Sequence, residues 1–336
     1  MSNSEQNILV IRLSAMGDVA ILVPVLEALF KQNKNVRITI LTQLFFAPIF
    51  KDFKNITVYP VDKKGKHKGF LGLFKLYKEL KPLQFTAIAD IHNVLRSNVL
   101  KLLFFNKKCI QIDKGRKEKK ELISKKNFKQ LKTSHERYAD VFRKLGFTID
   151  LSTPVFLEKK PIPTAFKNLI TSAHKTIGIA PFAAHKSKMY PLDQMKIVVE
   201  QLSKDYTILL FGGKSDVIQL ETLQTNQNIY LAAGKLSFTE ELNTISNLDC
   251  MISMDSGNAH LAAMYGIKVI TIWGVTHPFA GFAPFHQPTD YAMLADADQY
   301  PKIPTSIYGN KYPEDYLNCS ESIAPEQIIE KVKSIL

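Results

Sequence analysis

The sequence predicts an α/β protein built from two doubly wound domains. Three observations carry this prediction: a length of 336 residues, an alternation of short apolar strand-like runs with helical stretches, and a lapse of that alternation between residues 151 and 175. A chain of this length exceeds what one core usually holds. Strands that alternate with helices are typical of parallel sheets covered on both faces. We therefore expect domains at 1–150 and 176–320, a linker at 151–175 and a C-terminal helix within 321–336.

The first strand is expected at residues 7–13, a nearly continuous apolar run typical of a strand buried on both faces. A turn at 14–18 and an apolar-periodic helix at 19–30 follow, and Pro24 should kink that helix or delay its regular start. Asp18 lies between the strand and the helix. Either it caps the helix, or it stands beside a ligand cleft and takes a proton from an acceptor hydroxyl.

Further strands and helices alternate along the rest of the first domain. The pattern predicts them at 36–41, 44–50, 56–61, 70–80, 86–89, 95–104, 109–112 and 134–145. Asp90 and His92 directly follow the strand at 86–89, and Arg96 and Ser97 come soon after. Parallel sheets bind ligands at the carboxyl ends of their strands. We therefore expect these side chains at the same edge as Asp18.

The second domain is organised around residues 249–274, which read as a strand, a tight turn, a two-turn helix and a second strand. The turn is Asp255-Ser256-Gly257-Asn258. Gly257 lets the backbone approach a ligand, and the free N–H groups that open the helix suit a phosphate. His260 would add a third donor. The alternative is that Asp255 or Ser256 only caps the helix and His260 is a surface residue.

Two lysines, Lys186 and Lys188, lie in the loop that follows the strand at 176–180. Either they are solvated, or one of them lies near the 255–258 turn and offsets the charge of an anion bound there. Two doubly wound domains with facing strand ends would place the site in the cleft between them.

The composition is that of an ordinary globular protein, with 46% hydrophobic and 22% charged residues. Cys109, Cys250 and Cys319 are too widely spaced for a disulfide framework or a zinc site, which favours a reducing cytoplasm. The N-terminus lacks the basic region of a signal peptide. No uninterrupted apolar run reaches about 18 residues, so no membrane-spanning helix is expected.

The net charge of +13 predicts anionic partners: nucleic acid, an anionic lipid surface or phosphorylated small molecules. The charge is uneven, because residues 114–132 hold nine Lys or Arg residues against two Glu residues. This basic segment is either a solvated, mobile loop or a docking surface for an anionic partner.

Neither a Gly-x-Gly-x-x-Gly fingerprint nor a Walker A loop follows the first strand.

Four motifs together resemble glycosyltransferase family nine, the heptosyltransferases that build the lipopolysaccharide inner core. The motifs are Ile-Leu-Val-Ile-Arg-Leu-Ser-Ala-Met-Gly-Asp-Val (8–19), Ala-Asp-Ile-His (89–92) with Arg96-Ser97, Lys-Met-Tyr-Pro (188–191) and Asp-Ser-Gly-Asn-Ala-His-Leu (255–261). They run across both domains in the family's order. The resemblance implies a GT-B fold, two Rossmann-like domains that face each other across a cleft, with the acceptor bound by the first and the nucleotide sugar by the second.

The reaction implied by the resemblance is an inverting, metal-independent sugar transfer, with heptose from ADP-heptose expected and a lipopolysaccharide-core or related acceptor. No cofactor is expected. Asp18 matches the family's general base, and Lys188 matches the lysine that neutralises the diphosphate leaving group. The donor phosphates would lie at the 255–260 turn with Lys186, and Asp216 falls near the family's acidic residue for the ribose. Acceptor contacts are expected from Ser14, Gly17, Asp90, His92 and Arg96.

Two other function classes are also compatible with the sequence. One is a sugar-nucleotide epimerase or hydrolase of the same fold, which would use the phosphate site without a lipid acceptor. The other is a non-catalytic nucleotide- or nucleic-acid-binding module that uses the basic segment, although no nucleic-acid motif is present. The expected partners are a nucleotide sugar and an anionic lipid-linked saccharide, met by a cytoplasmic protein in peripheral contact with the inner membrane leaflet, and no nucleic acid.

Overall fold

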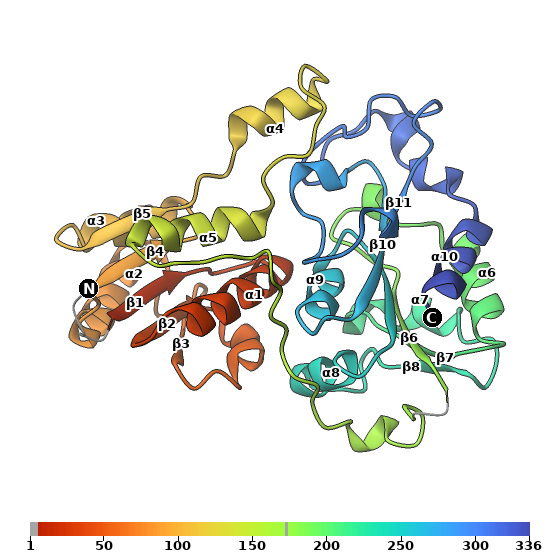
Figure 1. Ribbon diagram of the computed structural model, residues 1–336, viewed down its shortest axis with the longest axis horizontal. Helices are drawn as coiled ribbons and strands as arrows, with labels where there is room; N and C mark the ends of the chain where they lie inside the picture. Colours follow the sequence, from red (N-terminus) through yellow and green to blue (C-terminus); the bar gives the residue numbers. More distant parts are fainter. Residues whose placement is uncertain (1–5, 172–173) are drawn as a thin grey trace. The chain divides into compact units, whose positions relative to one another are not determined.

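The protein is described by a computed structural model that covers residues 6–171 and 174–336 (Figure 1). The chain forms two compact units. The first comprises the residues up to 114 together with 134–155, and the second comprises 115–133 and 156–336. Each unit is an α/β domain with its own parallel sheet.

The first sheet has the strand order β3-β2-β1-β4-β5, and all its strand pairs are parallel. Its strands are β1 (Gln6–Ile11), β2 (Val36–Thr42), β3 (Ile56–Pro60), β4 (Ala87–Asp90) and β5 (Lys108–Gln111). Its helices are α1 (Met16–Gln32), α2 (Gly69–Leu80), α3 (Leu95–Leu103) and α5 (Ser134–Leu145), with 3-10 turns η1 (Leu44–Phe50) and η2 (Lys81–Leu83).

Helices cover both faces of this sheet. Leu9 and Ile11 of β1 pack in one buried cluster with apolar residues of α2 and α3. Helix α1 connects β1 to β2, in the opposite direction across the sheet from the connections that contain α2 and α3. Because such crossovers are right-handed, α1 lies on the other face, where it packs with α5. Residues 8–11 are fully buried, which explains the continuous apolar run. The helix after β1 begins at Met16, earlier than predicted, and continues through Pro24.

The second sheet has the order β11-β10-β9-β6-β7-β8, again with parallel pairs. Its strands are β6 (Thr176–Ala180), β7 (Thr207–Leu210), β8 (Ile229–Leu231), β9 (Cys250–Met254), β10 (Lys268–Trp273) and β11 (Ala292–Leu294). Its helices are α4 (Arg116–Ile123), α6 (Leu192–Leu202), α7 (Val217–Glu221), α8 (Phe238–Ile245), α9 (Gly257–Ala263) and α10 (Pro325–Ile335). The 3-10 turns are η3 (Thr164–Phe166), η4 (Lys186–Lys188), η5 (Lys214–Asp216), η6 (Pro278–Ala280), η7 (Thr289–Tyr291), η8 (Glu314–Tyr316) and η9 (Cys319–Ser322).

The predicted fold class, two doubly wound parallel α/β domains, is confirmed. In each sheet the direction of strand addition reverses once. The reversal falls between β1 and β4 in the first sheet and between β6 and β9 in the second. Ligands of such sheets bind beyond the carboxyl ends of the strands at this reversal. A ligand site is therefore expected in the loops after these four strands.

The division of the chain differs from the predicted domains of 1–150 and 176–320. Residues 156–171, assigned to a linker, belong to the second unit, where Phe166 and Ile170 are buried. The C-terminal helix α10 packs on α6 and contributes Ile328 and Val332 to the core of the same unit. Proline-rich sequence does not prevent a segment from packing, and here it belongs to the second unit.

The basic segment is not the solvated, mobile loop offered as one reading. Residues 115–133 form α4 and an extended return, and both pack on the second unit. Leu122 and Leu131 lie in a buried cluster with Ala280. The ammonium group of Lys119 lies 4.2 Å from the ring centre of Phe282, a cation–π contact.

Within the described residues no helix has both the length and the hydropathy needed to cross a membrane. The three cysteines are free thiols, and Cys250 and Cys319 are buried.

Candidate functional site

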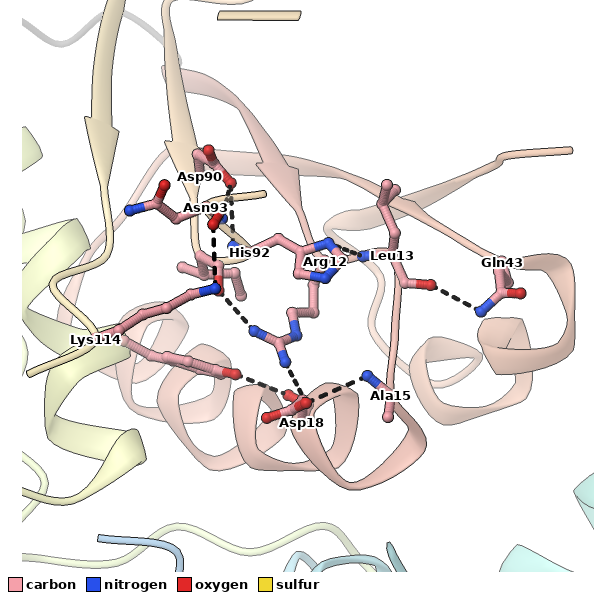
Figure 2. Close-up of polar contacts among 11 residues, drawn as sticks. Arg12, Leu13, Ala15, Asp18, Gln43, Asp90, His92, Asn93 and Lys114 are labelled. Atoms are coloured by element: carbon pink, nitrogen blue, oxygen red, sulfur yellow. Dashed lines mark hydrogen bonds and ion pairs between the residues drawn. The ribbon is translucent and has the colours of Figure 1, made fainter. Parts of the chain in front are cut away.

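Asp18 lies in the first turn of α1, at the carboxyl edge of the first sheet (Figure 2). Its Oδ2 forms an ion pair with Arg12 and accepts the backbone N–H of Ala15 at 3.2 Å. Oδ1 accepts no hydrogen bond from the described residues, and the side chain is 30% exposed. Asp18 therefore contributes to the cap of the helix, as one of the two interpretations predicted, and its role as a general base stays a prediction. One oxygen satisfies the start of the helix, and the other is available to a substrate.

Arg12 fixes the position of this carboxylate. Its guanidinium is buried and donates to the carbonyl of Ile91 at 2.8 Å, and it lies 5.7 Å from the ring centre of Tyr138. The Tyr138 hydroxyl donates to the backbone carbonyl of Asp18 at 3.3 Å. The sequence analysis did not identify Arg12 as part of the site, although a charged residue at the end of an apolar strand run was the available signal.

Asp90 holds the loop after β4 rather than presenting its charge to solvent. It is fully buried. Its Oδ1 accepts the backbone N–H groups of His92 at 3.0 Å and Asn93 at 2.8 Å, and its Oδ2 accepts the amide of Gln111 at 2.8 Å. Asp90 is therefore not exposed for the direct acceptor contact predicted for it, and what it does in this structure is to hold the backbone of His92 in place.

His92 joins this loop to the segment between β1 and α1. Its Nδ1 accepts the backbone N–H of Leu13 at 3.2 Å, so the proton of the neutral ring lies on Nε2 and can be donated. Burial lowers the pKa of His92 to about 4, and the nearby charges of Arg12 and Lys114 act in the same direction. The ring is therefore neutral near pH 7.

This lowered pKa predicts an acid-sensitive first unit. An unfolded histidine titrates near pH 6.5, so between about pH 6.5 and pH 4 the unfolded chain binds more protons than the folded one, and the free energy of unfolding falls with the pH. Burial also lowers the pKa of His277, so the decline in stability that His277 causes remains in a His92 variant and serves as the reference. Urea denaturation at several pH values should show a smaller decline in His92→Asn than in the parent. An unchanged decline would contradict the burial of a neutral His92.

The other residues predicted at this edge are Ser14, Gly17 and Arg96, which were also predicted to contact the acceptor, and Ser97. Ser14 and Gly17 are partly exposed, in the turn before α1 and in its first turn. Ser97 is buried and accepts the N–H of Val94 at 2.9 Å at the start of α3. Arg96, partly exposed on α3, forms no ion pair within the described residues, and its charge, after burial, lowers the pKa of Lys63.

In the second unit, the loops after β6 and β9 bring Lys188 and Asp255 together. The Lys188 ammonium lies 2.8 Å from Asp255 Oδ2, and the two side chains are only 13% and 9% exposed. The Thr276 hydroxyl donates to the same oxygen at 2.9 Å. An ammonium group has three N–H donors, so the pair with Asp255 leaves Lys188 able to bind a further anion.

The start of α9 lacks the side-chain cap offered as the alternative reading. Ser256 occupies the N-cap position without capping the helix, and its hydroxyl lies 3.1 Å from that of Ser253. The amides that open the helix at Gly257 thus remain available for an anion. Asn258 Oδ1 is buried without a hydrogen-bond partner in the described part of the chain. His260 is buried on α9 and is not a surface residue.

Neither Lys186 nor Asp216 forms a hydrogen bond or ion pair with Lys188 or Asp255 in the described part of the chain. Lys186 is exposed, and no interaction connects it to Asp255 within the described residues. Asp216 Oδ2 accepts the N–H of Gly213 at 2.7 Å, and the Ser215 hydroxyl donates to Oδ1 at 3.1 Å. Their donor-binding roles remain predictions. Among residues 6–171 and 174–336, no three acidic, histidine or cysteine side chains are grouped so that they could hold a metal ion.

Two glycines that the sequence analysis missed determine how Lys188 sits. A Cβ on Gly274 would lie 2.1 Å from the carbonyl oxygen of Ser187, which accepts the N–H of Val275 at 3.0 Å. A Cβ on Gly309, where φ is +80°, would lie 2.6 Å from the aliphatic stem of Lys188. The loop that carries Lys188 therefore packs directly against the backbone of these two glycines.

Gly309→Ala should weaken the binding of a nucleoside diphosphate. The methyl group pushes the flexible stem of Lys188 aside, and the positive φ adds strain. We expect roughly a tenfold loss of ADP affinity, equivalent to about 1.4 kcal/mol, measured by calorimetry. Gly146→Ala, at another positive φ with open space around its Cβ, is the matched control. Equal ADP affinity in the two variants would contradict the proposed seating of Lys188.

The fold is similar to that of known glycosyltransferases. The glycosyl transferase family 9 structure from Veillonella parvula DSM 2008 is 19% identical, with 100% of this chain and 98% of that chain covered and a TM-score of 0.76. The E. coli ADP-heptose lps heptosyltransferase II is 17% identical, with 98% of each chain covered and a TM-score of 0.70. The two parallel-sheet domains thus define a glycosyltransferase fold of the GT-B type.

The sequence assigns the family within this class. Residues 73–303 match the model of glycosyltransferase family 9 (heptosyltransferase). A lipooligosaccharide heptosyltransferase 2 from Campylobacter jejuni subsp. jejuni serotype O:6 is 24% identical over 332 residues, which cover 95% of this chain and 96% of that protein. The chain belongs to glycosyltransferase family 9, and it is a glycosyltransferase.

Proposed function

We propose that this enzyme transfers heptose from ADP-heptose to a lipopolysaccharide-core or lipooligosaccharide acceptor, with inversion at the anomeric carbon and without a metal ion. The names of its relatives support heptose and this class of acceptor. The observation that carries the proposal is the Lys188–Asp255 pair beside the uncapped start of α9. This arrangement suits the diphosphate of a nucleotide sugar.

The proposed reaction is a single displacement. An acceptor hydroxyl attacks the anomeric carbon of the heptose while the bond from that carbon to the diphosphate oxygen breaks, and the electron pair leaves with ADP. Asp18 takes the proton of the attacking hydroxyl through its available Oδ1. The remaining N–H donors of Lys188 and the first amides of α9 stabilise the negative charge that develops on the leaving diphosphate.

In this proposal Lys188 takes the part that a divalent cation plays in other phosphate-handling enzymes. It is a fixed positive charge placed next to the leaving group. The transfer rate should therefore be the same in EDTA and in added Mg²⁺. A rate that falls in EDTA and returns with Mg²⁺ would remove the metal-independent part of the proposal.

The acceptor side of the proposal rests on unneutralised positive charge in the first unit. Arg96 has no acidic partner within the described residues, and Lys63 lies close enough for its pKa to respond to the Arg96 charge. Positive charge of this kind suits a phosphorylated or carboxylated saccharide. We propose that the acceptor is anionic and lipid-linked, and that the enzyme meets it at the cytoplasmic leaflet of the inner membrane.

The deciding experiment offers the enzyme a panel of sugar nucleotides, with and without a heptose-deficient lipopolysaccharide core. We expect release of ADP from ADP-heptose that depends on the acceptor, and a product whose new linkage has the opposite anomeric configuration to the donor. Acceptor-independent release of free sugar, or conversion of the donor to an epimer, would instead support the hydrolase or epimerase alternative.

A further inference from the structure

Helix α2 is apolar on its outward face as well as on its buried face. Leu73, Leu76 and Leu80 are buried in the core of the first unit. Leu71 and Phe74 lie about half a helical turn from these residues around the axis, and they are 84% and 40% exposed. A helix whose outward face carries large apolar residues has a second environment to face besides its own core.

Helix α3 has the same character and packs beside α2. Leu95 and Leu102 are exposed on α3, and Phe105 is exposed directly after it. The two helices lie on the same face of the sheet, because β3 to β4 and β4 to β5 are crossovers in the same direction. The α2–α3 surface is defined here by Phe70, Leu71, Phe74, Leu95, Leu102 and Phe105, all at least 40% exposed.

The surroundings of the α2–α3 surface are strongly basic. Residues 62–108 contain eleven Lys or Arg residues against three Asp or Glu residues. The three carboxylates are all engaged locally. Asp62 accepts backbone N–H groups of Gly65 and Lys66, Glu79 accepts from Tyr59 and interacts with His67, and Asp90 is fully buried. The Lys78 ammonium lies over the Phe74 ring, 4.9 Å from its centre.

We propose that the α2–α3 surface rests on an anionic lipid bilayer. Leucine and phenylalanine side chains that project among lysines match an interface with acyl chains beneath and negative headgroups above. Each lysine near such a surface adds attraction, whereas the same lysines would repel a second copy of this chain. An acidic protein partner would satisfy the lysines but not six projecting apolar side chains.

This placement gives the bilayer a defined relation to the first sheet. Both α2 and α3 begin at the carboxyl edge of the sheet, because they follow β3 and β4. Asp18 and His92 lie at that same edge. A lipid-linked saccharide would then present its sugars close to the general base. Only this relation to the acceptor rests on the proposed function, since membrane binding itself requires no substrate.

The α2–α3 surface differs from the basic segment that the sequence had singled out. The exposed residues of α4 are all charged, and of its two apolar residues Leu122 is buried in the second unit and Ile123 is partly buried. A purely charged face would attract an anionic surface but insert nothing. Removing two lysines from α2 and removing two from α4 therefore make a matched comparison, because both change the charge equally but only the α2 lysines lie among exposed apolar side chains.

The test is cosedimentation of the full chain with vesicles of phosphatidylcholine alone and of phosphatidylcholine with about one third phosphatidylglycerol, at about 0.15 M salt. We expect binding to the anionic vesicles only. Leu71→Ser with Phe74→Ser should weaken it at least tenfold. Lys75→Gln with Lys78→Gln should weaken it about fivefold for each lysine removed.

Two control variants accompany these. Ile197→Ser with Ile218→Ser removes exposed apolar residues of the second unit, and Lys117→Gln with Lys120→Gln removes exposed lysines of α4. Both should bind vesicles as the parent does. Loss of binding only in the α4 variant, or equal binding by all variants, would overturn the proposal. So would a parent dimer in ultracentrifugation that Leu71→Ser with Phe74→Ser converts to a monomer, since the surface would then be an interface between copies.

Failure of this proposal and failure of the proposed function give different results. A soluble, delipidated core acceptor needs no membrane, so Leu71→Ser with Phe74→Ser should transfer sugar to it at the parent rate. Vesicle binding without any transfer would leave the surface in place and refute the reaction. Transfer without vesicle binding would refute the surface alone.

Discussion

Asp18→Asn should lower the rate of sugar transfer by about a thousandfold, within the range of about 10² to 10⁴ that general bases supply. An asparagine has the same shape and can still accept the N–H of Ala15. Its amide cannot take the proton of an attacking hydroxyl. Donor binding should remain within a few fold of the parent value, because the donor-binding residues proposed here belong to the second unit. The measurements are kcat with a saturating acceptor and the Kd for ADP by calorimetry.

The control for this variant is Glu240→Gln. Glu240 occupies the same position in the first turn of α8, and its carboxylate accepts the N–H of the N-cap residue Ser237 at 2.8 Å. It therefore reproduces the capping role of Asp18 without the proposed chemistry. We expect Glu240→Gln to transfer sugar at the parent rate. Equal turnover in Asp18→Asn and the parent would remove the base assignment.

The sequence predicted most elements because their signals are local. The range 134–145 was predicted as a helix and α5 has those bounds, since Ser134 opens an amphipathic stretch and Gly146, at φ +108°, ends it. The meeting of Lys188 with Asp255 was also within reach. Their loops follow β6 and β9, which are neighbours in the sheet, and the carboxyl ends of parallel strands share an edge.

Contacts that depend on irregular chain were not predictable in this way. The Ser187 hydroxyl donates a hydrogen bond to the carbonyl of Gly309, which lies 122 residues away in a stretch without regular structure. No periodicity indicates where such a stretch passes. The hydrogen bond from Arg12 to the carbonyl of Ile91 joins residues 79 positions apart. Only the three-dimensional arrangement of β1 and β4 shows that a buried arginine connects the loops after these two strands to Asp18.

The basic segment shows how composition can obscure packing. Nine Lys or Arg residues between 114 and 132 favour a solvated loop. Two leucines among them, Leu122 and Leu131, decide the outcome by packing on Ala280. Conversely, the exposed leucines of α2 and α3 gave no distinct signal, because in a sequence they are indistinguishable from core residues.

Lys188→Met should affect both the fold and the reaction. Methionine fills the space of the lysine stem but leaves Asp255 without a cation. The Asp255 side chain is only 9% exposed. Removing one partner of a buried pair typically costs about 3 kcal/mol or more. We expect that loss in the free energy of unfolding, measured in urea. We also expect at least a hundredfold loss of kcat, because the leaving diphosphate loses its fixed positive charge.

A second substitution separates the two effects. In Lys188→Met with Asp255→Asn, no unpaired charge is buried and the Thr276 hydroxyl keeps an acceptor in the asparagine amide. Stability should return to within about 1 kcal/mol of the parent, as for a buried pair replaced at both ends. Transfer should stay at the level of Lys188→Met, because no cation faces the diphosphate. If the double variant regained turnover together with stability, Lys188 would be a structural partner of Asp255, and the charge of the leaving group would have to be offset elsewhere.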